Sequence, residues 1–394
     1  MARPAQNGGR KGGCAPRGPR YLNQLEAVPE LERKERRRLR RVSERYAFRS
    51  NDYYQSLIDW EDPADPIRRI VMPDPSELVS WGVLDASDEA SFTVVPGLEH
   101  KYADTALLLV NHFCGGYCRF CFRKRLFMDG NDEVVRDLTE GLAYIRRRPG
   151  ISNIVLSGGD PLILPTRKLE RILTALGKIP NVRIIRIGTK MPAFNPYRVL
   201  DDPALLDSIR RHSRGERRIY IMAHFNHPRE LSAAAIRCMS LLQRAGAITV
   251  NQTPILCGVN DDPAVLAQLF AVLTEIGVPP YYVFQCRPTE GNRPYVIPVE
   301  ESYRIFESAQ RRCCGLARWA RMVMSHESGK IQVIGIQDDL THFRFHRATK
   351  QEEEGRVMSF PSNPDAYWFD DYSMLGYEEV VLRPRRGPAL RRQP

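Results

Sequence analysis

The sequence predicts an α/β protein in which strand–helix units repeat along the chain, and three observations support this fold class. Short β-rich runs occur at 106–111, 153–157, 182–188, 218–223, 247–251 and 280–284. Helical patterns occur between and after them, at 133–148, 166–178, 202–213, 229–245, 262–276 and 299–312. Strands and helices that alternate at this spacing are typical of parallel βαβ units. Six such units are too few for a full eight-stranded barrel, so a partial barrel or an open doubly wound sheet fits the pattern.

The remaining segments differ in composition from this repeating part. The first 20 residues are Gly, Pro, Arg and Ala with little to bury, which predicts disorder. The stretch 31–49 is helix-forming, although its apolar residues are too sparse for a strong stripe. We therefore expect a disordered basic arm, an N-terminal helical extension, the barrel, an irregular C-terminal segment and a disordered Arg-rich tail, at 1–20, 21–99, 100–312, 313–382 and 383–394.

Composition narrows the class of protein. The chain has 394 residues, of which 43% are hydrophobic and 27% charged, so most of it can bury a normal core. No apolar run approaches about 18 residues, and the first residues lack an apolar signal segment. We expect no membrane span and no secretion signal, and hence a cytoplasmic protein. In a reducing compartment, clustered cysteines predict metal binding or catalysis rather than disulfides.

The net charge of +11 is concentrated at the two ends of the chain. Residues 1–50 carry +9 and residues 383–394 carry +5, which leaves −3 for the part between them. Basic ends attract phosphates without specificity, but these ends lack the interleaved aromatic residues that stack on bases. A nucleic-acid-modifying enzyme is therefore the weakest of the functions considered, and solvated Arg-rich termini are the simpler interpretation.

Three cysteines follow the first predicted strand in the spacing C-x3-C-x2-C, namely Cys114, Cys118 and Cys121. Three thiolates on one short loop can hold three irons of a [4Fe–4S] cluster and leave the fourth iron open to a substrate or cofactor. One alternative is a zinc site completed by His112, and another is three inert buried cysteines. Zinc sites usually contain paired C-x2-C elements, and no second pair follows downstream.

The cysteine loop resembles that of the radical S-adenosylmethionine (SAM) superfamily, which places an aromatic residue, here Phe120, before the last cysteine. The resemblance implies a partial (βα)6 barrel, a [4Fe–4S] cluster whose open iron binds SAM, and an electron donor such as flavodoxin or ferredoxin. SAM is then cleaved to a 5′-deoxyadenosyl radical that abstracts hydrogen from a substrate. Matching positions for SAM binding are Ser157, Gly158, Gly159 and Asp160 at the end of the second strand, and His224 and Gln252 further on.

A closer resemblance extends over about residues 45–335. Segments at 51–69, 100–110, 118–125, 156–164, 183–199, 224–228, 251–261 and 279–286 all look like the lysine 2,3-aminomutase family. Members of this family are isomerases that use SAM and pyridoxal 5′-phosphate to move an amino group between adjacent carbons of a small amino-acid substrate. The resemblance implies that Arg123 binds the substrate α-carboxylate, a role that suits a guanidinium because it can donate two parallel hydrogen bonds. It also implies that Lys330 is the lysine that forms an imine with pyridoxal phosphate.

Two departures from the family concern pyridoxal phosphate. The glycine run before the Schiff-base lysine is reduced here to Ser328-Gly329, and an arginine that contacts the cofactor is replaced by Thr105, with Lys101 nearby. These changes favour the alternative of a pyridoxal-independent radical SAM enzyme, such as an epimerase, dehydrogenase or lyase. Lysine-specific members also carry cysteines that bind a structural zinc at a subunit interface, and no cysteine follows Cys314 here. A homodimer of this chain would therefore form without that zinc site.

A third departure concerns the substrate. Lysine-specific members place an aspartate where this chain has Arg287. Arg287 would repel a lysine side chain and could pair with a carboxylate, which predicts an acidic substrate resembling glutamate or aspartate. It also speaks against a variant function, the modification of a lysine on a protein. The alternative is that Arg287 pairs with an acid of the protein itself, such as Glu290.

Overall fold

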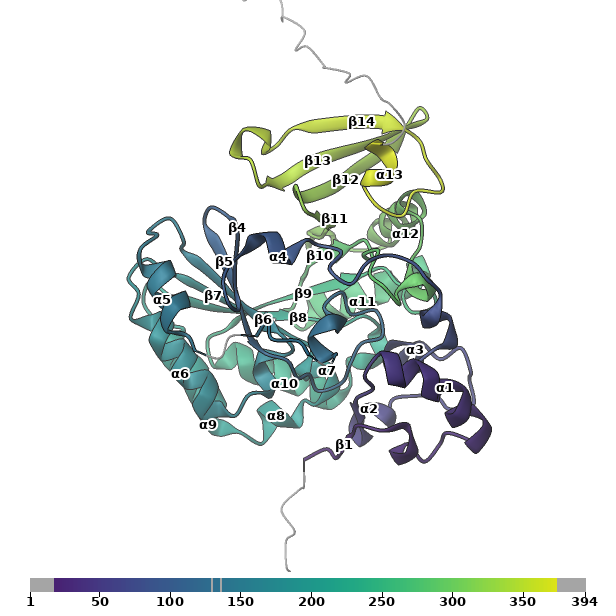
Figure 1. Ribbon diagram of the computed structural model, residues 1–394, viewed down its shortest axis with the longest axis horizontal. Helices are drawn as coiled ribbons and strands as arrows, with labels where there is room; N and C mark the ends of the chain where they lie inside the picture. The colour runs from purple at the N-terminus through teal and green to yellow at the C-terminus, as the bar shows by residue number, and fades with distance from the viewer. Residues whose placement is uncertain (1–17, 129, 135–136, 374–394) are drawn as a thin grey trace, which may run out of the picture.

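The computed structural model describes residues 18–128, 130–134 and 137–373, and a sheet of parallel strands with surrounding helices lies at its centre (Figure 1). Each of the six β-rich runs in the sequence forms a strand. These strands are β5 (Thr105–Asn111), β6 (Asn153–Gly158), β7 (Ile184–Thr189), β8 (Arg218–Ala223), β9 (Ile248–Pro254) and β10 (Pro280–Phe284). The long helices are α5 (Thr139–Arg146), α6 (Thr166–Gly177), α9 (Pro203–His212), α10 (Ala233–Arg244), α11 (Pro263–Glu275) and α12 (Val299–Arg311).

The order of the strands identifies the sheet as a partial barrel. From β5 to β10 each strand pairs in parallel with the next strand along the chain. Sequential order with right-handed crossovers places all connecting helices on one face, whereas a doubly wound sheet reverses its order. The barrel does not close, because β5 pairs on its other side with β4 (Leu98–Tyr102). The predicted (βα)6 barrel is therefore confirmed.

Local sequence signals explain where several helices begin. The side chains of Asp202, Ser232 and Asp262 each accept a backbone hydrogen bond at the start of α9, α10 and α11. Proline occupies the first turn of α9 and α11, where its missing N–H costs nothing. These caps fix the helix starts directly after the loops that carry the candidate site residues.

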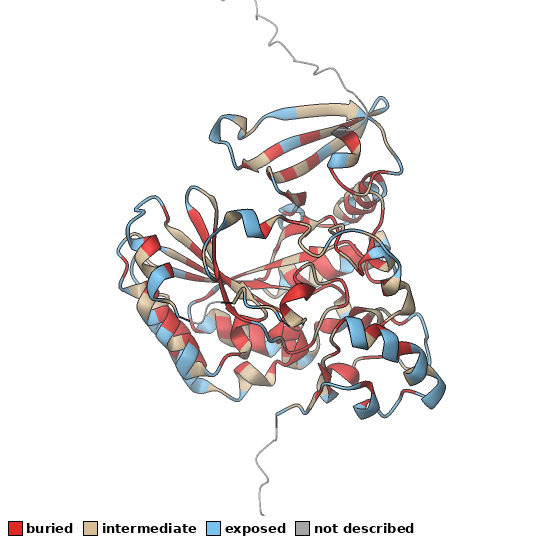
Figure 2. Ribbon diagram, in the orientation of Figure 1, coloured by how far each residue is buried: buried red, intermediate tan, exposed pale blue. Residues whose placement is uncertain are grey.

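Burial alternates along β7, and this alternation separates the core from the barrel interior. Figure 2 shows the burial of all the described elements. In β7, Ile185 and Ile187 are fully buried in the core that packs against the helices. The intervening Arg186 and Gly188 instead line cavities inside the barrel. A strand with period two therefore delivers polar residues to the interior while its other face holds the fold together.

The N-terminal extension, residues 21–99, packs against the barrel. Its elements are β1 (Tyr21–Leu22), α1 (Arg33–Arg45), β2 (Ser50–Asn51), α2 (Asp52–Gln55), α3 (Pro66–Val71), α4 (Glu89–Phe92) and β3 (Thr93–Val95). The sparse apolar residues of the 31–49 stretch are all buried, including Leu39 and Val42 of α1. Leu31, Leu39 and Phe48 belong to a second hydrophobic core that includes Phe120 and Phe194, so the extension supports the cysteine loop.

The segment after residue 312 departs from its prediction. Instead of being irregular, it forms β11 (Arg321–His326), β12 (Gly329–Gln337), β13 (Leu340–Ala348), β14 (Val357–Pro361) and the short helix α13 (Asp370–Ser373). β11 continues the barrel as a parallel neighbour of β10, and the other three strands are antiparallel. Figure 1 shows β12, β13 and β14 in yellow-green to yellow, above the strands of the barrel. Their position matters because β12 carries Lys330.

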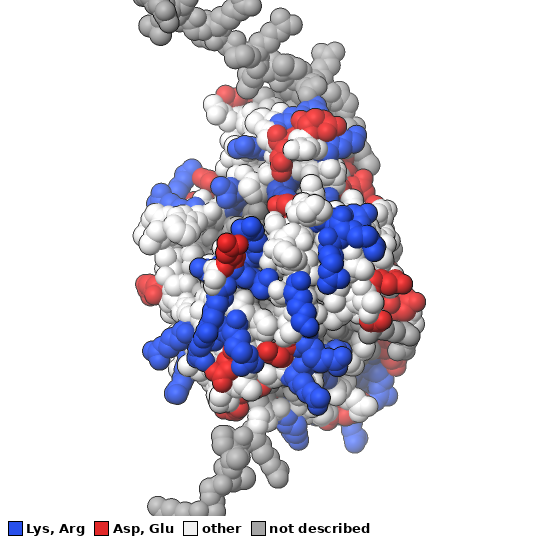
Figure 3. Space-filling model, turned by 90° about the vertical axis from the view of Figure 1, so that its left-hand side faces the viewer, with Lys and Arg blue, Asp and Glu red and all other residues white. Residues whose placement is uncertain are grey.

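The predicted disordered termini, apart from residues 18–20, lie outside the described residues, as does the end of the predicted C-terminal segment from residue 374. Within the described part of the chain, no helix is both long and apolar enough to cross a membrane. Lys and Arg outnumber Asp and Glu on the face shown in Figure 3, so basic side chains are not confined to the ends of the chain.

Candidate active site

The cysteine loop that follows β5 is held tightly against its surroundings. A Cβ atom on Gly115 would lie 2.7 Å from the Met191 sulfur, and one on Gly116 would lie 2.8 Å from the Phe194 ring. The Asn51 side chain donates hydrogen bonds to the carbonyls of Gly115, at 3.1 Å, and Phe194, at 2.8 Å. The loop is therefore fixed by contacts that leave no room for larger residues.

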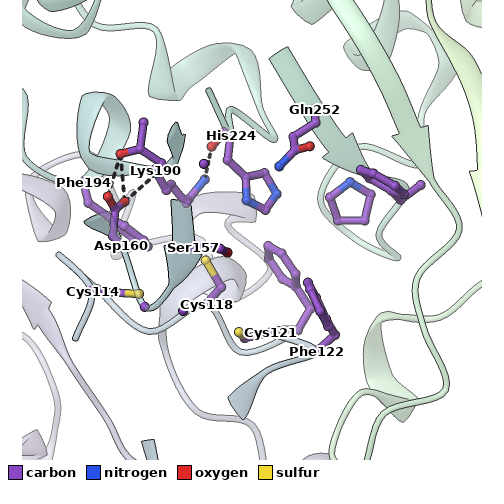
Figure 4. Close-up of a pocket in the computed structure, with 18 of the residues that line it drawn as sticks. Cys114, Cys118, Cys121, Phe122, Ser157, Asp160, Lys190, Phe194, His224 and Gln252 are labelled. Carbon is purple, nitrogen blue, oxygen red and sulfur yellow. Dashed lines mark hydrogen bonds between the residues drawn. The ribbon is translucent and has the colours of Figure 1, made fainter. Parts of the chain in front are cut away.

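Cys114, Cys118 and Cys121 all line one cavity of about 190 Å³ inside the barrel mouth. Figure 4 shows the three cysteines on one side of this cavity and His224 and Gln252 on the other. Burial raises the pKa of all three thiols, that of Cys118 to about 12. Among the described residues no three His, Cys, Asp or Glu side chains are grouped to hold a single metal ion. The donor set suits a cluster in which each thiolate binds a different iron.

The turn at the end of β6 explains why two glycines occur together. The Gly159 N–H donates to the Asn111 carbonyl at 2.6 Å, and the Asp160 N–H donates to the Phe113 carbonyl at 2.7 Å. A Cβ on Gly158, whose φ is +108°, would lie 2.4 Å from the Asn111 oxygen. One on Gly159 would lie 2.1 Å from the Phe113 oxygen. The glycines are required because the turn docks directly on the backbone of the cysteine loop.

Asp160 lines the first cavity, but its carboxylate is occupied by protein donors. It accepts hydrogen bonds from the Thr189 hydroxyl and from the backbone N–H groups of Leu162, Lys190 and Met191. Burial raises the pKa of this carboxyl to about 6. The structure thus gives Asp160 a role in joining the ends of β6 and β7, and its predicted contact with SAM stays a prediction.

His224, at the end of β8, presents a free nitrogen to the same cavity. Its Nε2 atom is buried without a hydrogen-bond partner among the described residues. Burial, and next to it the charge of Lys190, lower the pKa of His224 to about 3, so the ring is neutral. Buried polar atoms are usually paired, and the unpaired nitrogen therefore fits a missing ligand such as SAM.

Lys190 holds the backbone that carries His224, and sequence reasoning missed it. Its Nζ donates to the His224 carbonyl at 2.9 Å, to Asn226 Oδ1 at 2.6 Å and to Glu230 Oε1 at 2.5 Å. Glu230 in turn accepts from the buried Tyr54 hydroxyl at 2.6 Å. A lysine after a barrel strand carries no signal by itself, because its partners come from a different strand–helix unit.

A second cavity of about 240 Å³ adjoins the first and contains Lys330. The two cavities share the lining residues Phe122, Ser157, Gly188, Gln252, Phe284 and Arg287. The Lys330 amine lies 4.2 Å from the centre of the Tyr282 ring and 5.2 Å from that of Phe284. Burial, together with nearby cations, lowers the pKa of Lys330 well below its usual value. A lowered pKa favours the uncharged, nucleophilic form of the amine, which is the form that bonds to an aldehyde.

Arg123 lies in the second cavity as expected, but it already has an acidic partner. Its Nε and Nη2 donate to the Glu89 carboxylate at 2.9 and 2.6 Å, and its Nη1 donates to Ser157 Oγ at 2.8 Å. Although burial opposes its charge, Arg123 and then Arg125 lower the pKa of Glu89 to about 2. Sequence reasoning missed Glu89 because it lies on α4, 34 residues before Arg123.

A second acid in this cavity, Glu99 of β4, was also missed. Its Oε1 atom is buried without a hydrogen-bond partner among the described residues. Burial, and next to it the negative charge of Glu89, raise the pKa of Glu99 to about 8. The carboxyl is therefore mostly protonated near neutral pH. Glu89 is thus the charged acid of the second cavity, and Glu99 is largely neutral.

Arg287 lines both cavities, and the structure rules out the alternative that it pairs with Glu290. The Glu290 carboxylate accepts instead from Arg45, at 2.6 Å, and from the Tyr46 hydroxyl, at 2.8 Å. Arg287 Nη1 donates to the Ser87 hydroxyl, and its guanidinium lies 3.7 Å from the centre of the Phe122 ring. Within the described part of the chain, Arg287 forms no ion pair with an acid.

The remaining cysteines bear on the alternatives raised by the sequence. His112, proposed as a fourth zinc ligand, is exposed and packs on Phe113. Cys313 is buried and Cys314 is exposed. All eight cysteines within the described residues are free.

This chain is similar in sequence to a known protein superfamily and to several known enzymes. A family model described as the Radical SAM superfamily matches residues 108–270. A protein of Aquifex aeolicus (strain VF5), named provisionally as an L-lysine 2,3-aminomutase, is 55% identical over 357 residues, which cover 90% of this chain and 96% of its own length. The L-lysine 2,3-aminomutase of Clostridium subterminale is 35% identical over 67% of this chain and 62% of its own length. The glutamate 2,3-aminomutase of Clostridioides difficile (strain 630) is 30% identical over 75% of this chain and 69% of its own length.

Proposed function

This chain belongs to the lysine 2,3-aminomutase family of radical SAM enzymes, and is thus an isomerase; we propose that it moves the amino group of an acidic free amino acid between carbons 2 and 3. The observation that carries the substrate class is Arg287. Its guanidinium faces the cavity of Lys330 without an acidic partner among the described residues. A buried cation is costly unless an anion accompanies it. A carboxylate on the substrate side chain supplies that anion.

The first cavity would hold the [4Fe–4S] cluster and SAM. Cys114, Cys118 and Cys121 provide three thiolates, and the unpaired Nε2 of His224 and the amide of Gln252 face the space beside them. When bound and reduced by an external donor such as flavodoxin or ferredoxin, the cluster and SAM supply a carbon-centred radical. The apolar rings of Phe120, Phe122 and Phe194 line this space, which keeps water away from reactive groups.

The second cavity would hold the substrate and pyridoxal phosphate. Lys330, whose amine lies near the rings of Tyr282 and Phe284, is the residue we assign to attach the cofactor. When bound, pyridoxal phosphate supplies a π-system that stabilises unpaired electrons on the migrating nitrogen and its carbons. Because the two cavities share Ser157, Gln252 and Arg287, a substrate held in the second lies next to SAM in the first.

The two arginines would orient the substrate from both ends. Arg123 Nη1 donates one hydrogen bond, to Ser157, and its second N–H points to the α-carboxylate in this proposal. Arg287 would bind the side-chain carboxylate, and its position over the Phe122 ring limits how far the guanidinium can move. A lysine substrate would place its ammonium against the same guanidinium, where like charges repel. The enzyme of Clostridioides difficile named for glutamate is consistent with this substrate class.

A turnover assay tests the proposal directly. The enzyme, reconstituted without oxygen and supplied with SAM, pyridoxal phosphate and a reductant, is given glutamate or lysine separately. Glutamate is the better acidic probe, because moving the amino group of aspartate regenerates aspartate. We expect 3-aminopentanedioate from glutamate. An enzyme that acts on lysine alone contradicts the acidic-substrate proposal.

A variant pair sharpens this test. Arg287→Gln keeps a hydrogen-bonding side chain but removes the charge, and Arg293→Gln changes an exposed arginine six residues further along the chain. We expect the first change to lower kcat/KM for glutamate by about tenfold to about hundredfold, the effect of losing one charge-assisted contact. The second should leave kcat/KM within about twofold. Equal effects of the two changes contradict the role of Arg287.

A pyridoxal-independent radical SAM enzyme is the second candidate function. The short Ser328-Gly329 run and Thr105 favour it. A substrate-dependent turnover that persists after complete removal of pyridoxal phosphate would support this candidate.

The free state of all eight described cysteines further supports our expectation that the protein works in a reducing compartment such as the cytoplasm.

A further inference from the structure

The second cavity carries more positive charge than its own acids neutralise. Its basic lining residues are Lys101, Arg123, Arg186, Arg287, Lys330 and Arg347, and its acidic ones are Glu89 and Glu99. Glu89 is occupied by Arg123 and Arg125, and Glu99 is largely protonated. Lys330 adds little to this charge because its pKa is lowered, and Arg347 forms an ion pair with Asp104, whose side chain is 53% exposed. With a substrate dicarboxylate on Arg123 and Arg287, Arg186 still has no ion pair among the described residues. The cavity therefore has the charge to bind a further anion.

Arg347 lies next to Lys330 in the sheet. The two residues are direct partners in the antiparallel ladder of β12 and β13, and directly opposed residues point to the same face. Both line the second cavity. The Arg347 guanidinium is held at the start of β5, where Nη1 donates to Thr105 Oγ1 at 3.3 Å and Nη2 donates to Asp104. It also lies 4.3 Å from the centre of the Tyr102 ring, so its position is set by three residues.

Arg186 supplies a second guanidinium inside the barrel. It lies on β7 between Val155 of β6 and Tyr220 of β8 in the parallel register. Its Nε donates to Asn153 Oδ1 at 3.0 Å, and within the described part of the chain it forms no ion pair with an acid. Burial lowers the pKa of this guanidinium, and the charge of Arg347 adds to that effect. Asp104 forms an ion pair with Arg347, and its charge also acts on Arg186, so one acid serves two guanidinium groups. The positive charge that is left suits a doubly charged oxyanion.

We propose that Arg347 and Arg186 bind the phosphate group of pyridoxal 5′-phosphate while Lys330 carries its aldehyde carbon. This inference rests on the proposed function, because it assumes that Lys330 binds this cofactor. Arg347 and Lys330 share one hairpin, so the sheet fixes the spacing of the two groups. This placement also bears on Thr105, which stands where the family has an arginine that contacts the cofactor. Arg347 of β13 contacts Thr105, so a guanidinium is present at this place although it comes from β13 and not from β5.

Comparing pyridoxal phosphate with pyridoxal, which lacks the phosphate, tests this assignment. The reconstituted full-length enzyme is titrated with each compound, binding is followed by visible absorbance, and borohydride reduction maps the adduct. The variants are Arg347→Gln, Arg186→Gln and the control Arg344→Gln. Arg344 is an exposed arginine on the same strand, β13. None of these readouts depends on turnover.

The expected result is a loss that depends on the phosphate. Arg347→Gln and Arg186→Gln should each weaken pyridoxal phosphate binding by about tenfold to about hundredfold. Pyridoxal binding should stay within about twofold of the wild type, and Arg344→Gln should match the wild type for both compounds. Arg347→Lys, which retains the charge without the planar fork, should recover part of the loss. A variant that retains pyridoxal binding also shows that it has folded.

Two results overturn the inference and one concerns the proposed function. Equal losses for both compounds would mean that the arginines support the cavity without binding phosphate. No change for either compound in either variant would place the phosphate elsewhere, such as beside Lys101. A wild-type enzyme that forms no adduct at Lys330 with either compound would instead refute the cofactor assignment on which the inference rests.

Discussion

Glu89 accepts two hydrogen bonds from Arg123, one from Nε at 2.9 Å and one from Nη2 at 2.6 Å. Both residues line the cavity that also contains Lys330. Both side chains are buried, and Glu89 also accepts from Arg125 at 2.7 Å. Because the carboxylate binds two donors on one edge of the guanidinium, Arg123 is oriented before any substrate arrives. Glu89 lies on α4 of the N-terminal extension, so the extension itself holds Arg123 in position at the proposed substrate site.

Replacing Glu89 should destabilise the protein far more than replacing an exposed partner of the same cluster. Glu89→Gln leaves the buried Arg123 without a carboxylate partner among the described residues and removes one of the partners of Arg125. We expect a loss of about 3 kcal/mol in the free energy of unfolding. Glu133→Gln removes an acid whose side chain is 37% exposed and which also pairs with Arg125. Its expected cost is below about 1 kcal/mol. Urea unfolding measures both, and similar values for the two variants contradict the role of Glu89.

The low pKa of Glu89 also predicts how stability depends on acid. The folded-state value of about 2 lies below the ordinary 4.5, so the stabilising charge is fully present above the ordinary value. It is lost as the pH falls toward the folded-state value. The free energy of unfolding of the wild type should therefore decline from about pH 5 to about pH 2. Glu89→Gln should show a shallower decline, and identical slopes would contradict this account.

Glu99 predicts the opposite dependence on pH. Its folded-state pKa of about 8 lies above the ordinary 4.5, so its contribution is fully present at low pH and is lost as the pH rises toward 8. Glu99→Gln, which mimics the protonated acid, should be more stable than the wild type at pH 9 and similar to it at pH 4. Unfolding at the two pH values checks this. A variant that is equally destabilised at both contradicts the buried, protonated state.

Lys190 should affect SAM binding without affecting the cluster. The double variant Lys190→Met/Glu230→Gln removes both buried charges, so neither is left unpaired. We expect iron content to remain unchanged and SAM affinity to fall by about tenfold, because the His224 backbone loses its anchor. Equilibrium dialysis with SAM and iron analysis give the two readouts. Lys178→Met, at an exposed lysine, is the control. Loss of iron together with SAM would indicate a general collapse instead.

The sequence was sufficient for the barrel and for the residues that bind through a local motif. Cys114, Cys118 and Cys121 are recognisable because a cluster needs three ligands on one loop, so their spacing carries the signal. The pair Gly158-Gly159 is recognisable for a similar reason, although the close contacts it allows are with Asn111 and Phe113. The positions of the six strands were also predicted, since alternation and turn residues are local features. Their ends were less accurate, because β9 continues to Pro254 although its predicted end is residue 251.

Other site residues could not be predicted because their roles depend on distant partners. Glu89 acts on Arg123 from a different segment, and Arg347 reaches Thr105 across 242 residues. The β12–β13 hairpin did carry a signal that was overlooked. Apolar and polar residues alternate on both sides of Asp338-Asp339, and both aspartates adopt positive φ values, of 51° and 59°. Such a two-residue turn is typical of hairpins.

The most direct test of the account is to map where pyridoxal phosphate attaches. The cluster is reconstituted without oxygen, the cofactor is added, the complex is reduced with borohydride, and peptides are analysed by mass. We predict a pyridoxyl group on Lys330, the lysine of lowered pKa near the rings of Tyr282 and Phe284. An adduct on Lys101, the other lysine of the cavity, or no adduct in a protein that still cleaves SAM, would contradict the account.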